Sequence, residues 1–115
     1  MDEQLCTEKW VERVAIVGAS GELDMLTAPQ LRDAVQSALS KTPSGLIVDL
    51  TQVDFLGSAG MQVLMEAHNQ TSGTQTRFAV VADGSATSRP LKITGIADLI
   101  DLFSSLDDAL ENFTE

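Results

Sequence analysis

Residues 45–70, GLIVDLTQVDFLGSAGMQVLMEAHNQ, contain the two patterns that indicate the architecture most clearly. Leu46 to Leu50 form a short apolar run bounded by turn residues, which is typical of a strand buried on both faces of a sheet. The stretch that follows has the spacing of an amphipathic helix, with one face formed by Met61, Leu64, Met65 and His68. Ser58 is expected as the N-cap of this helix. A buried strand followed closely by a helix indicates an α/β structure.

The sequence before this stretch predicts a strand pair and a first helix. Residues 5–10 and 11–19 are rich in β-branched and apolar side chains, and they predict two strands with a turn near Glu12 and Arg13. Thr27, followed by Pro29 and Gln30, is typical of a helix start with a capping box. The apolar positions of the next segment recur at helical spacing: Leu31, Ala34, Val35, Ala38 and Leu39. We therefore expect a helix that ends before residues 42–45, TPSG.

The sequence after it predicts three further elements and a return to the sheet. Residues 78–82 form a second buried strand, and a short helix begins near Ser88 and ends at Gly95. Residues 99–103 lead back to the sheet, and Ser105 with Asp108 caps a last helix. The predicted order is strand, strand, helix, strand, helix, strand, helix, strand, helix. With no repeat or linker in between, residues 1–115 are expected to form a single domain.

Composition restricts the partners that the chain can have. The 115 residues include 17 acidic and 7 basic side chains, which give a formal charge of −10. This charge repels nucleic acid and anionic membranes, so neither is expected as a partner, and it suits a partner with a basic face. The segment Met1-Asp2-Glu3 is acidic where a signal peptide would be basic, and no apolar run approaches the roughly 20 residues that span a bilayer. We expect a cytoplasmic protein.

Metal and thiol chemistry have few candidate residues. Cys6 is the only cysteine and His68 the only histidine, so an internal disulfide and a zinc site are excluded. We interpret Cys6 as a small apolar side chain in the first strand and His68 as a partly buried structural residue. No metal and no cofactor are expected.

Catalytic motifs are also missing. Residues 18–21, GASG, lack the third glycine of a dinucleotide-binding loop and are interpreted as a turn. Asp49 and Asp54 resemble the phosphoacceptor region of a response regulator, but the acidic pair that would hold magnesium after the first strand is missing. No nucleophile, base and orienting group can be assembled, so we expect no catalytic residues and no enzyme.

The segment from Asp54 to Gly60 remains as the candidate site. Gly57 and Gly60 allow tight backbone turns, and Ser58 stands where the strand ends and the helix begins. This arrangement is compatible with a simple loop that has a capping serine. It is equally compatible with a phosphorylation site, because the amide groups and dipole of a helix start favour an anion.

Two parts of the chain resemble the STAS domain family of anti-sigma factor antagonists. Residues 21–24, GELD, and 27–32, TAPQLR, are similar to the family's G-E-L-D and T-A-x-x-L-R opening. Further matches to its V-D-L, V-x-F-x-D-S-x-G-L and L-x-x-T-G-L motifs follow in order: residues 47–50 (IVDL), 53–55 (VDF), 58–60 (SAG) and 91–96 (LKITGI). The resemblance covers nearly the whole chain. It implies a mixed sheet of about five strands with about four helices packed mainly on one face.

The resemblance also implies a function. Such a protein binds an anti-sigma factor, a serine kinase of the GHKL type, and thereby releases a sigma factor for transcription, as in a stress response. In the family, that kinase phosphorylates the serine that opens the second helix, and the matching position is Ser58. A PP2C-type phosphatase is implied as a second partner. The chain would then be a regulatory phosphoprotein that is itself no enzyme.

The matching positions imply which residues contact the partner. The family's aspartate before the serine is here Gly57, its second hydroxyl residue is Ala59, and its leucine after the glycine is Met61. The aspartate of the G-E-L-D motif, which lies near the serine in the family, is Asp24. The implied partner-binding residues are Asp24, Gly57, Ser58, Ala59, Gly60 and Met61.

Two alternatives stay open at this point. The chain is either an antagonist switched off by phosphorylation of Ser58 or a STAS scaffold or ligand-sensing module of a signalling assembly that is not phosphorylated. A lone STAS domain favours the antagonist, because scaffold members commonly carry a further sensor domain, whereas the missing carboxylate at Gly57 favours the scaffold. Asp24 is either a partner contact or a turn residue whose side chain binds local amide groups.

Overall fold

The computed structural model describes residues 5–113, in which five strands form one mixed sheet. The antiparallel pair β1 (Cys6–Val11) and β2 (Val14–Leu23) turns at Glu12 and Arg13, as the sequence predicts. The strands β3 (Gly45–Leu56), β4 (Arg77–Val81) and β5 (Asp101–Phe103) then add in parallel, so that the strand order is β1-β2-β3-β4-β5. The segment Met1-Asp2-Glu3, which supports the prediction about a signal peptide, lies outside the described residues.

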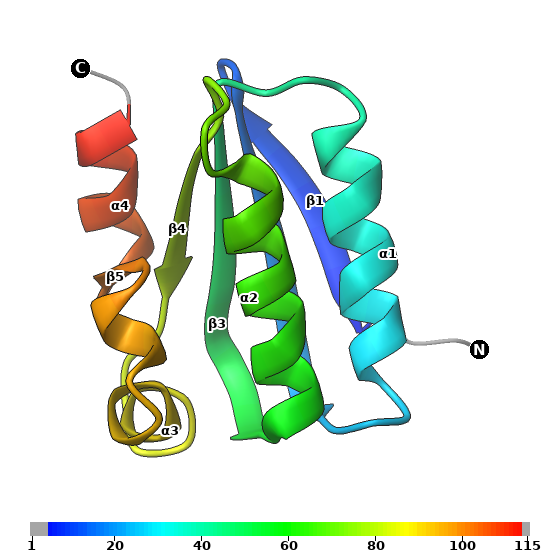
Figure 1. The fold of residues 1–115 in the computed structure, drawn as a ribbon, viewed down its shortest axis with the longest axis vertical. Helices are drawn as coiled ribbons and strands as arrows, with labels where there is room; N and C mark the ends of the chain where they lie inside the picture. The colour runs from blue at the N-terminus through cyan, green and yellow to red at the C-terminus, as the bar shows by residue number, and fades with distance from the viewer. Residues whose placement is uncertain (1–4, 114–115) are drawn as a thin grey trace.

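The helices alternate with the parallel strands in the predicted order (Figure 1). The helices α1 (Ala28–Leu39), α2 (Ser58–Thr71) and α3 (Ser88–Ile93) each connect two parallel strands. Because right-handed crossovers that advance in one direction along a sheet stay on one face, these helices share a face. The helix α4 (Leu106–Phe113) follows the last strand and packs on the opposite face, and a short 3-10 turn, Ile96–Asp98, precedes β5. The predicted packing, mainly on one face, is therefore confirmed.

Two apolar cores lie on the two faces of the sheet. Alternate residues of a strand point to opposite faces, so Val17 and Val48 join the larger core while Ile16 and Ile47 join the smaller one. The larger core also takes the predicted apolar stripe of α1 and the inner face of α2, with Leu31 and other side chains fully buried. Each such leucine contributes about 1.5–3 kcal/mol through burial. The sheet is held chiefly by this larger core.

The main corrections to the predicted elements concern β2 and β3. Residues 18–21, predicted as a turn, lie inside β2, where the pairing with β3 shifts register between Gly18 and Ser20 and again between Gly21 and Glu22. Gly21 has a φ of 79°, which a glycine adopts without strain, so the strand bends and continues. Residues 54–56, predicted as part of a loop, are the end of β3. Both strands are longer than predicted because each supplies the other with hydrogen-bond partners.

The other predicted helix ends agree with the structure in most respects. Ser105 caps α4, since its Oγ accepts a hydrogen bond of 3.1 Å from the amide of Asp108. The chain leaves α3 through Gly95, which has a φ of 83°. The predicted start of α1 is confirmed, but its capping box does not form, because the hydroxyl of Thr27 donates to the carbonyl of Glu22 at 2.7 Å instead. Thr27 thus holds the preceding loop to the end of β2.

Candidate functional site

The candidate site lies where the carboxyl ends of β2 and β3 meet, at the lower end of the molecule in Figure 1. Leu23, the last residue of β2, pairs with Leu56, the last residue of β3. Its carbonyl then accepts a hydrogen bond of 2.9 Å from the amide of Gly57. The two loop segments that the sequence singled out, at Asp24 and at residues 57–61, are therefore direct neighbours. The register of one pair of strands brings them together.

Ser58 is the first residue of α2, and its side chain is exposed. The prediction that Ser58 is the N-cap is wrong: the N-cap is Gly57, which has no side chain to cap the helix. The amide groups of the first turn are consequently uncapped. Within residues 5–113, the hydroxyl of Ser58 makes no hydrogen bond. An uncapped helix start favours an anion, so the site is chemically suited to a phosphorylated serine.

Neither Gly57 nor Gly60 forms the tight turn that the sequence predicts, and Gly60 is required for close packing instead. Gly57 has a φ of −88° and a ψ of 179°, which any residue adopts. A Cβ atom at Gly60 would lie 2.8 Å from Cδ1 of Leu56 and 3.1 Å from Cβ of Leu23. The first turn of α2 therefore sits directly on the two strand ends. A Cβ atom at Gly57 would lie 3.1 Å from the ring of Phe55, a tighter contact than usual.

Asp24 anchors the loop between β2 and α1. Its Oδ1 accepts hydrogen bonds from the amide of Leu26 at 2.9 Å and from the amide of Thr27 at 3.1 Å. The hydroxyl oxygen of Thr27 also lies 3.1 Å from this oxygen. These bonds, with that from Leu26 the strongest influence, hold the pKa of the Asp24 carboxyl below its usual value. The interpretation of Asp24 as a turn residue is confirmed, whereas its role as a partner contact stays a prediction.

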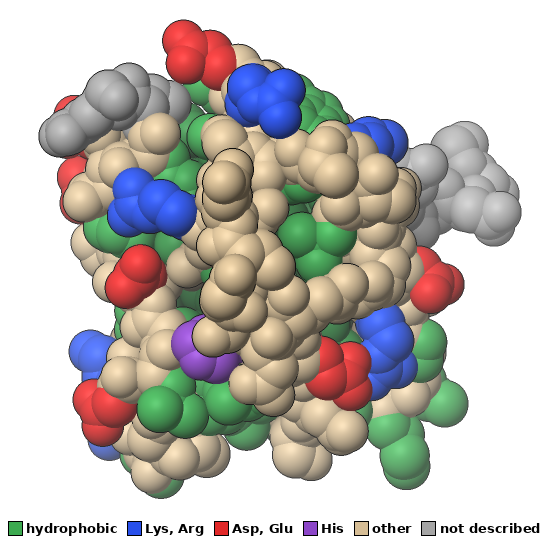
Figure 2. Space-filling view, turned by 45° about the horizontal axis from the view of Figure 1, so that its top comes forward, with side chains coloured by type: hydrophobic (Ala, Val, Ile, Leu, Met, Phe, Trp, Pro, Cys, Tyr) green, Lys and Arg blue, Asp and Glu red, His purple; other side chains and the backbone are tan. Residues whose placement is uncertain are grey.

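An apolar patch, which we define as Met25, Leu26 and Phe55, surrounds this end of the site. The exposed fractions of these residues are 77%, 82% and 51%. Figure 2 shows hydrophobic side chains gathered along the lower rim of the molecule, the end at which these loops lie. This patch was not predicted from the sequence, although an adjacent methionine and leucine within a loop were the available signal. Large apolar side chains exposed together commonly mark a surface that binds another protein.

Ala59 and Met61 are less exposed than this patch. Both are half-buried and pack against the larger core. The hydroxyl of Thr94 donates to the carbonyl of Pro90 at 2.7 Å, and its oxygen lies 3.9 Å from the sulfur of Met61. The first turn of α2 therefore contacts the end of α3, so α3 borders the candidate site.

The remaining candidate residues lie elsewhere. Cys6 is half-buried in β1, and burial raises the pKa of its thiol, which favours the uncharged form expected of a small apolar side chain. His68 is half-buried on α2, as predicted, and lies a few turns away from Ser58. Asp49 accepts a hydrogen bond from the amide of Thr51, and its side chain has no part in the site.

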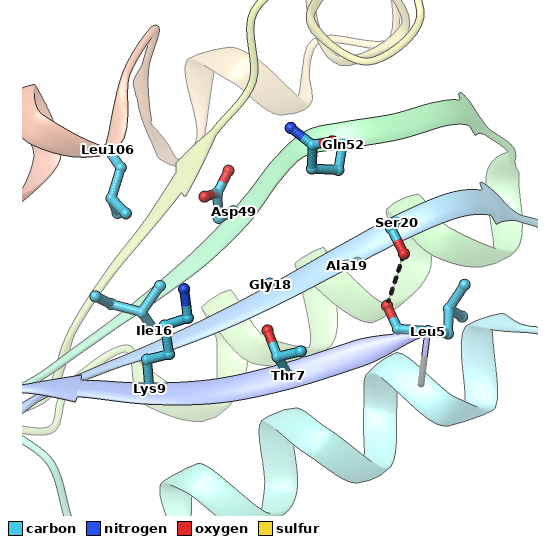
Figure 3. Close-up of a pocket in the computed structure, with 10 residues that line it drawn as sticks. All are labelled: Leu5, Thr7, Lys9, Ile16, Gly18, Ala19, Ser20, Asp49, Gln52 and Leu106. Atoms are coloured by element: carbon cyan, nitrogen blue, oxygen red, sulfur yellow. Dashed lines mark hydrogen bonds between the residues drawn. The ribbon is translucent and has the colours of Figure 1, made fainter. Parts of the chain in front are cut away.

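Figure 3 shows a hollow on the sheet face opposite α1 and α2. It has a volume of about 220 Å³ and is lined by Lys9, Gly18, Asp49 and neighbouring residues. None of the implied partner-binding residues lies in it. Among the described residues, no group of three His, Cys, Asp or Glu side chains is placed to hold a metal ion, and no helix is long and apolar enough to cross a membrane.

Comparison with known proteins places this site in context. The chain is 40% identical over 97 residues to the anti-sigma-F factor antagonist RsfB of Mycobacterium tuberculosis, a match that covers 84% of this chain and 79% of that protein. It is 29% identical over 83 residues to an anti-sigma-B factor antagonist of Listeria monocytogenes, covering 72% of this chain and 73% of that protein. The crystal structure of an anti-sigma factor antagonist from Mycobacterium paratuberculosis superimposes with a TM-score of 0.90 at 36% identity, covering 96% of this chain and 93% of that one.

The family assignment follows from the extent of these matches. Residues 9–109 match the STAS domain family over both the sheet and the helices that carry the site. The predicted fold and the resemblance described above are confirmed. The chain belongs to the STAS domain family.

Proposed function

We propose that this protein is an antagonist of an anti-sigma factor. The anti-sigma factor binds the surface around Ser58 and is released when Ser58 is phosphorylated. The names of the relatives support the antagonist function. The observation that carries the role of Ser58 is its exposed hydroxyl at an uncapped helix start, beside the apolar patch. The anti-sigma factor is then the serine kinase itself, and its capture frees a sigma factor for transcription.

The two parts of the surface have different tasks in this proposal. The apolar patch supplies area that excludes water when the partner binds, and such buried apolar contacts commonly dominate the affinity. Ser58 lies within reach of a kinase because its side chain is exposed. A hydroxyl is small and uncharged, so the unphosphorylated side chain is tolerated in the interface.

Phosphorylation changes this balance. A phosphate adds about −1.5 to −2 charge, and the helix start offsets it by only about 0.3–1 kcal/mol. Desolvating an unpaired anion in an interface costs several kcal/mol, and about 3 kcal/mol corresponds to a roughly 150-fold loss of affinity. The fold itself tolerates the modification, because Ser58 is on the surface.

Titration calorimetry with the anti-sigma-F factor of Mycobacterium tuberculosis tests the proposal, with RsfB as the positive control. We expect Ser58→Ala to bind about as tightly as the wild type and Ser58→Glu to bind much more weakly. Ser37→Glu, on the exposed side of α1, adds the same charge away from the site and should bind normally. After incubation with ATP, mass spectrometry should locate a phosphate on Ser58. Equal affinities of the Ala and Glu variants would remove Ser58 as the switch.

The missing carboxylate at Gly57 favours the scaffold function. Without the carboxylate that the family usually has beside the serine, the loop lacks a group that would contact the attacking hydroxyl or organise the kinase complex. A scaffold or ligand-sensing module would bind its partner and leave Ser58 unmodified. Binding that persists with ATP, while Ser58 stays unphosphorylated, would favour this second function.

A further inference from the structure

The helix α3 carries two free cations in a strongly acidic protein. Arg89 and Lys92 are exposed and three residues apart, so they lie on the same side of the helix. Within residues 5–113, neither side chain forms an ion pair or a hydrogen bond. The chain as a whole has a charge of −10. Unpaired cations of this kind are available to a partner.

Most other basic side chains are already engaged inside the protein. Arg13 donates to the carbonyl of Thr42, Arg32 pairs with Glu66 at 2.8 Å, Lys41 pairs with Glu8 at 2.6 Å, and Arg77 lies 4.3 Å from the centre of the Phe113 ring. Among the described residues, Lys9 is the remaining basic side chain without such a contact, and it lies on β1, beside the hollow of Figure 3. The cations of α3 therefore form the one adjacent pair that is free.

The same surface has an apolar component. Ile93, next to Lys92, is 75% exposed. An open hollow of about 400 Å³ is lined by Arg89, Lys92 and Ile93, together with Ser88 and the loop at residues 83–85. Asp83 is the one acidic residue in its lining, so the hollow keeps a net positive charge. We refer to Arg89, Lys92 and Ile93 as the α3 surface.

The α3 surface continues the surface around Ser58. Thr94, the residue after Ile93, contacts Met61, which is in the first turn of α2. Figure 1 shows α3 at the same end of the molecule as the start of α2. A partner that covers Ser58 is therefore at the same end of the molecule as α3.

We propose that the α3 surface binds an acidic segment of the anti-sigma factor, with an apolar side chain of that segment against Ile93. The proposal rests on the function proposed above. Without the two cations, the rest of the chain has a charge of −10 − 2 = −12, so it attracts basic parts of a partner and repels acidic ones. An acidic segment is accepted at α3 and disfavoured elsewhere. The α3 surface thus fixes the orientation in which the partner sits over Ser58.

Charge reversal at single positions tests the proposal. The variants Arg89→Glu, Lys92→Glu and Lys9→Glu each change the net charge from −10 to −12, so they differ only in where the charge lies. Their affinities for the anti-sigma-F factor of Mycobacterium tuberculosis are measured by titration calorimetry, with thermal melts to confirm folding. We expect each α3 variant to bind about fivefold more weakly, which corresponds to about 1 kcal/mol. Lys9→Glu should change the affinity less than about twofold, and the α3 effect should shrink in high salt.

The outcomes separate this proposal from the one on which it rests. If the wild type binds and the α3 variants match Lys9→Glu, the α3 surface is not a contact, while the antagonist function stands. If the wild type does not bind, both proposals are overturned. Ile93→Ser should also weaken binding, and it leaves the charge unchanged, so a normal affinity would remove the apolar contact. Sedimentation that shows self-association lost in the α3 variants would instead assign the surface to a second copy of the chain.

Discussion

Replacing Gly57 with aspartate should stabilise the protein, because it adds a cap to the uncapped start of α2. The backbone at Gly57 is in the extended conformation that N-cap residues adopt. A carboxylate there is placed to accept a hydrogen bond from the amide of Ala59 or Gly60. The substitution also restores the group that the family usually has beside the serine.

The size of the effect follows from two opposing contributions. Relative to glycine, an aspartate cap is worth a few tenths of a kcal/mol, and its charge near the helix start adds about 0.3–1 kcal/mol. Against this, the new Cβ atom would lie 3.1 Å from Cε2 of Phe55 and 3.4 Å from the carbonyl oxygen of Leu23. Phe55 is half-exposed, so its ring can turn aside, at a cost of about 0.5 kcal/mol. We expect a net gain of about 0.5 kcal/mol in the free energy of unfolding.

Gly57→Ala is the matched control, because it adds the same Cβ atom without an acceptor. Urea unfolding followed by circular dichroism at neutral pH should show Gly57→Asp to be about 1 kcal/mol more stable than Gly57→Ala. Equal stabilities would show that the carboxylate does not reach the first-turn amides. A second test compares the rates at which one kinase phosphorylates Gly57→Asp and the wild type. A rate for Gly57→Asp no higher than that of the wild type would show that the missing carboxylate does not limit the reaction.

Two further variants test the parts of the structure beside the site. The amides of Leu26 and Thr27 lower the pKa of the Asp24 carboxyl. Its carboxylate therefore stabilises the fold at pH values above the unfolded-state pKa, about 3.9. This contribution is lost as the pH falls through the lower folded-state pKa. Calorimetric melts should therefore show a lower Tm for Asp24→Ala at pH 7 and a smaller difference from the wild type near about pH 2.5, whereas a constant difference would contradict this. Leu91 is fully buried, so Leu91→Ala should cost about 2–5 kcal/mol in urea unfolding, and a loss below about 1 kcal/mol would mean that α3 is not anchored by the core.

The order of the elements could be predicted because each has a pattern that its surroundings do not change. The buried run at Leu46 to Leu50 and the helical spacing that begins at Leu31 both reflect the side chains that the larger core takes up. The turn at Glu12 and the cap of α4 at Ser105 depend on neighbouring residues alone. Elements that depend on such local patterns can therefore be predicted from the sequence.

The ends of β2 and β3 could not be predicted, because they depend on pairing between distant segments. Residues 18–21 have the composition of a turn, yet the ladder with β3 and the positive φ of Gly21 keep them in the strand. The same pairing places Gly57 at the N-cap of α2, so Ser58 is the first residue of the helix and does not cap it. Spacing along the chain carries no information on such register shifts.

The surface features of the site could be predicted from the residue patterns only in small part. The adjacency of Asp24 and Ser58 was implied only by resemblance, and the structure supplies the physical reason, which is the hydrogen bond from Gly57 to Leu23. The exposure of Met25 and Leu26 depends on which faces other elements leave uncovered. The free state of Arg89 and Lys92 likewise depends on where the acidic side chains lie after folding.

The strand order of the sheet has a consequence for how the two parts of the partner surface can change in evolution. Since the strands follow chain order, one ladder between β2 and β3 brings together Asp24 and Ser58, with a single helix between these strands. No later strand is needed for that contact. The α3 surface belongs to the next crossover, after β4. Insertions and substitutions there can accumulate without altering the ladder at Ser58, so the proposed contact at α3 and the proposed phosphorylation site are free to diverge separately.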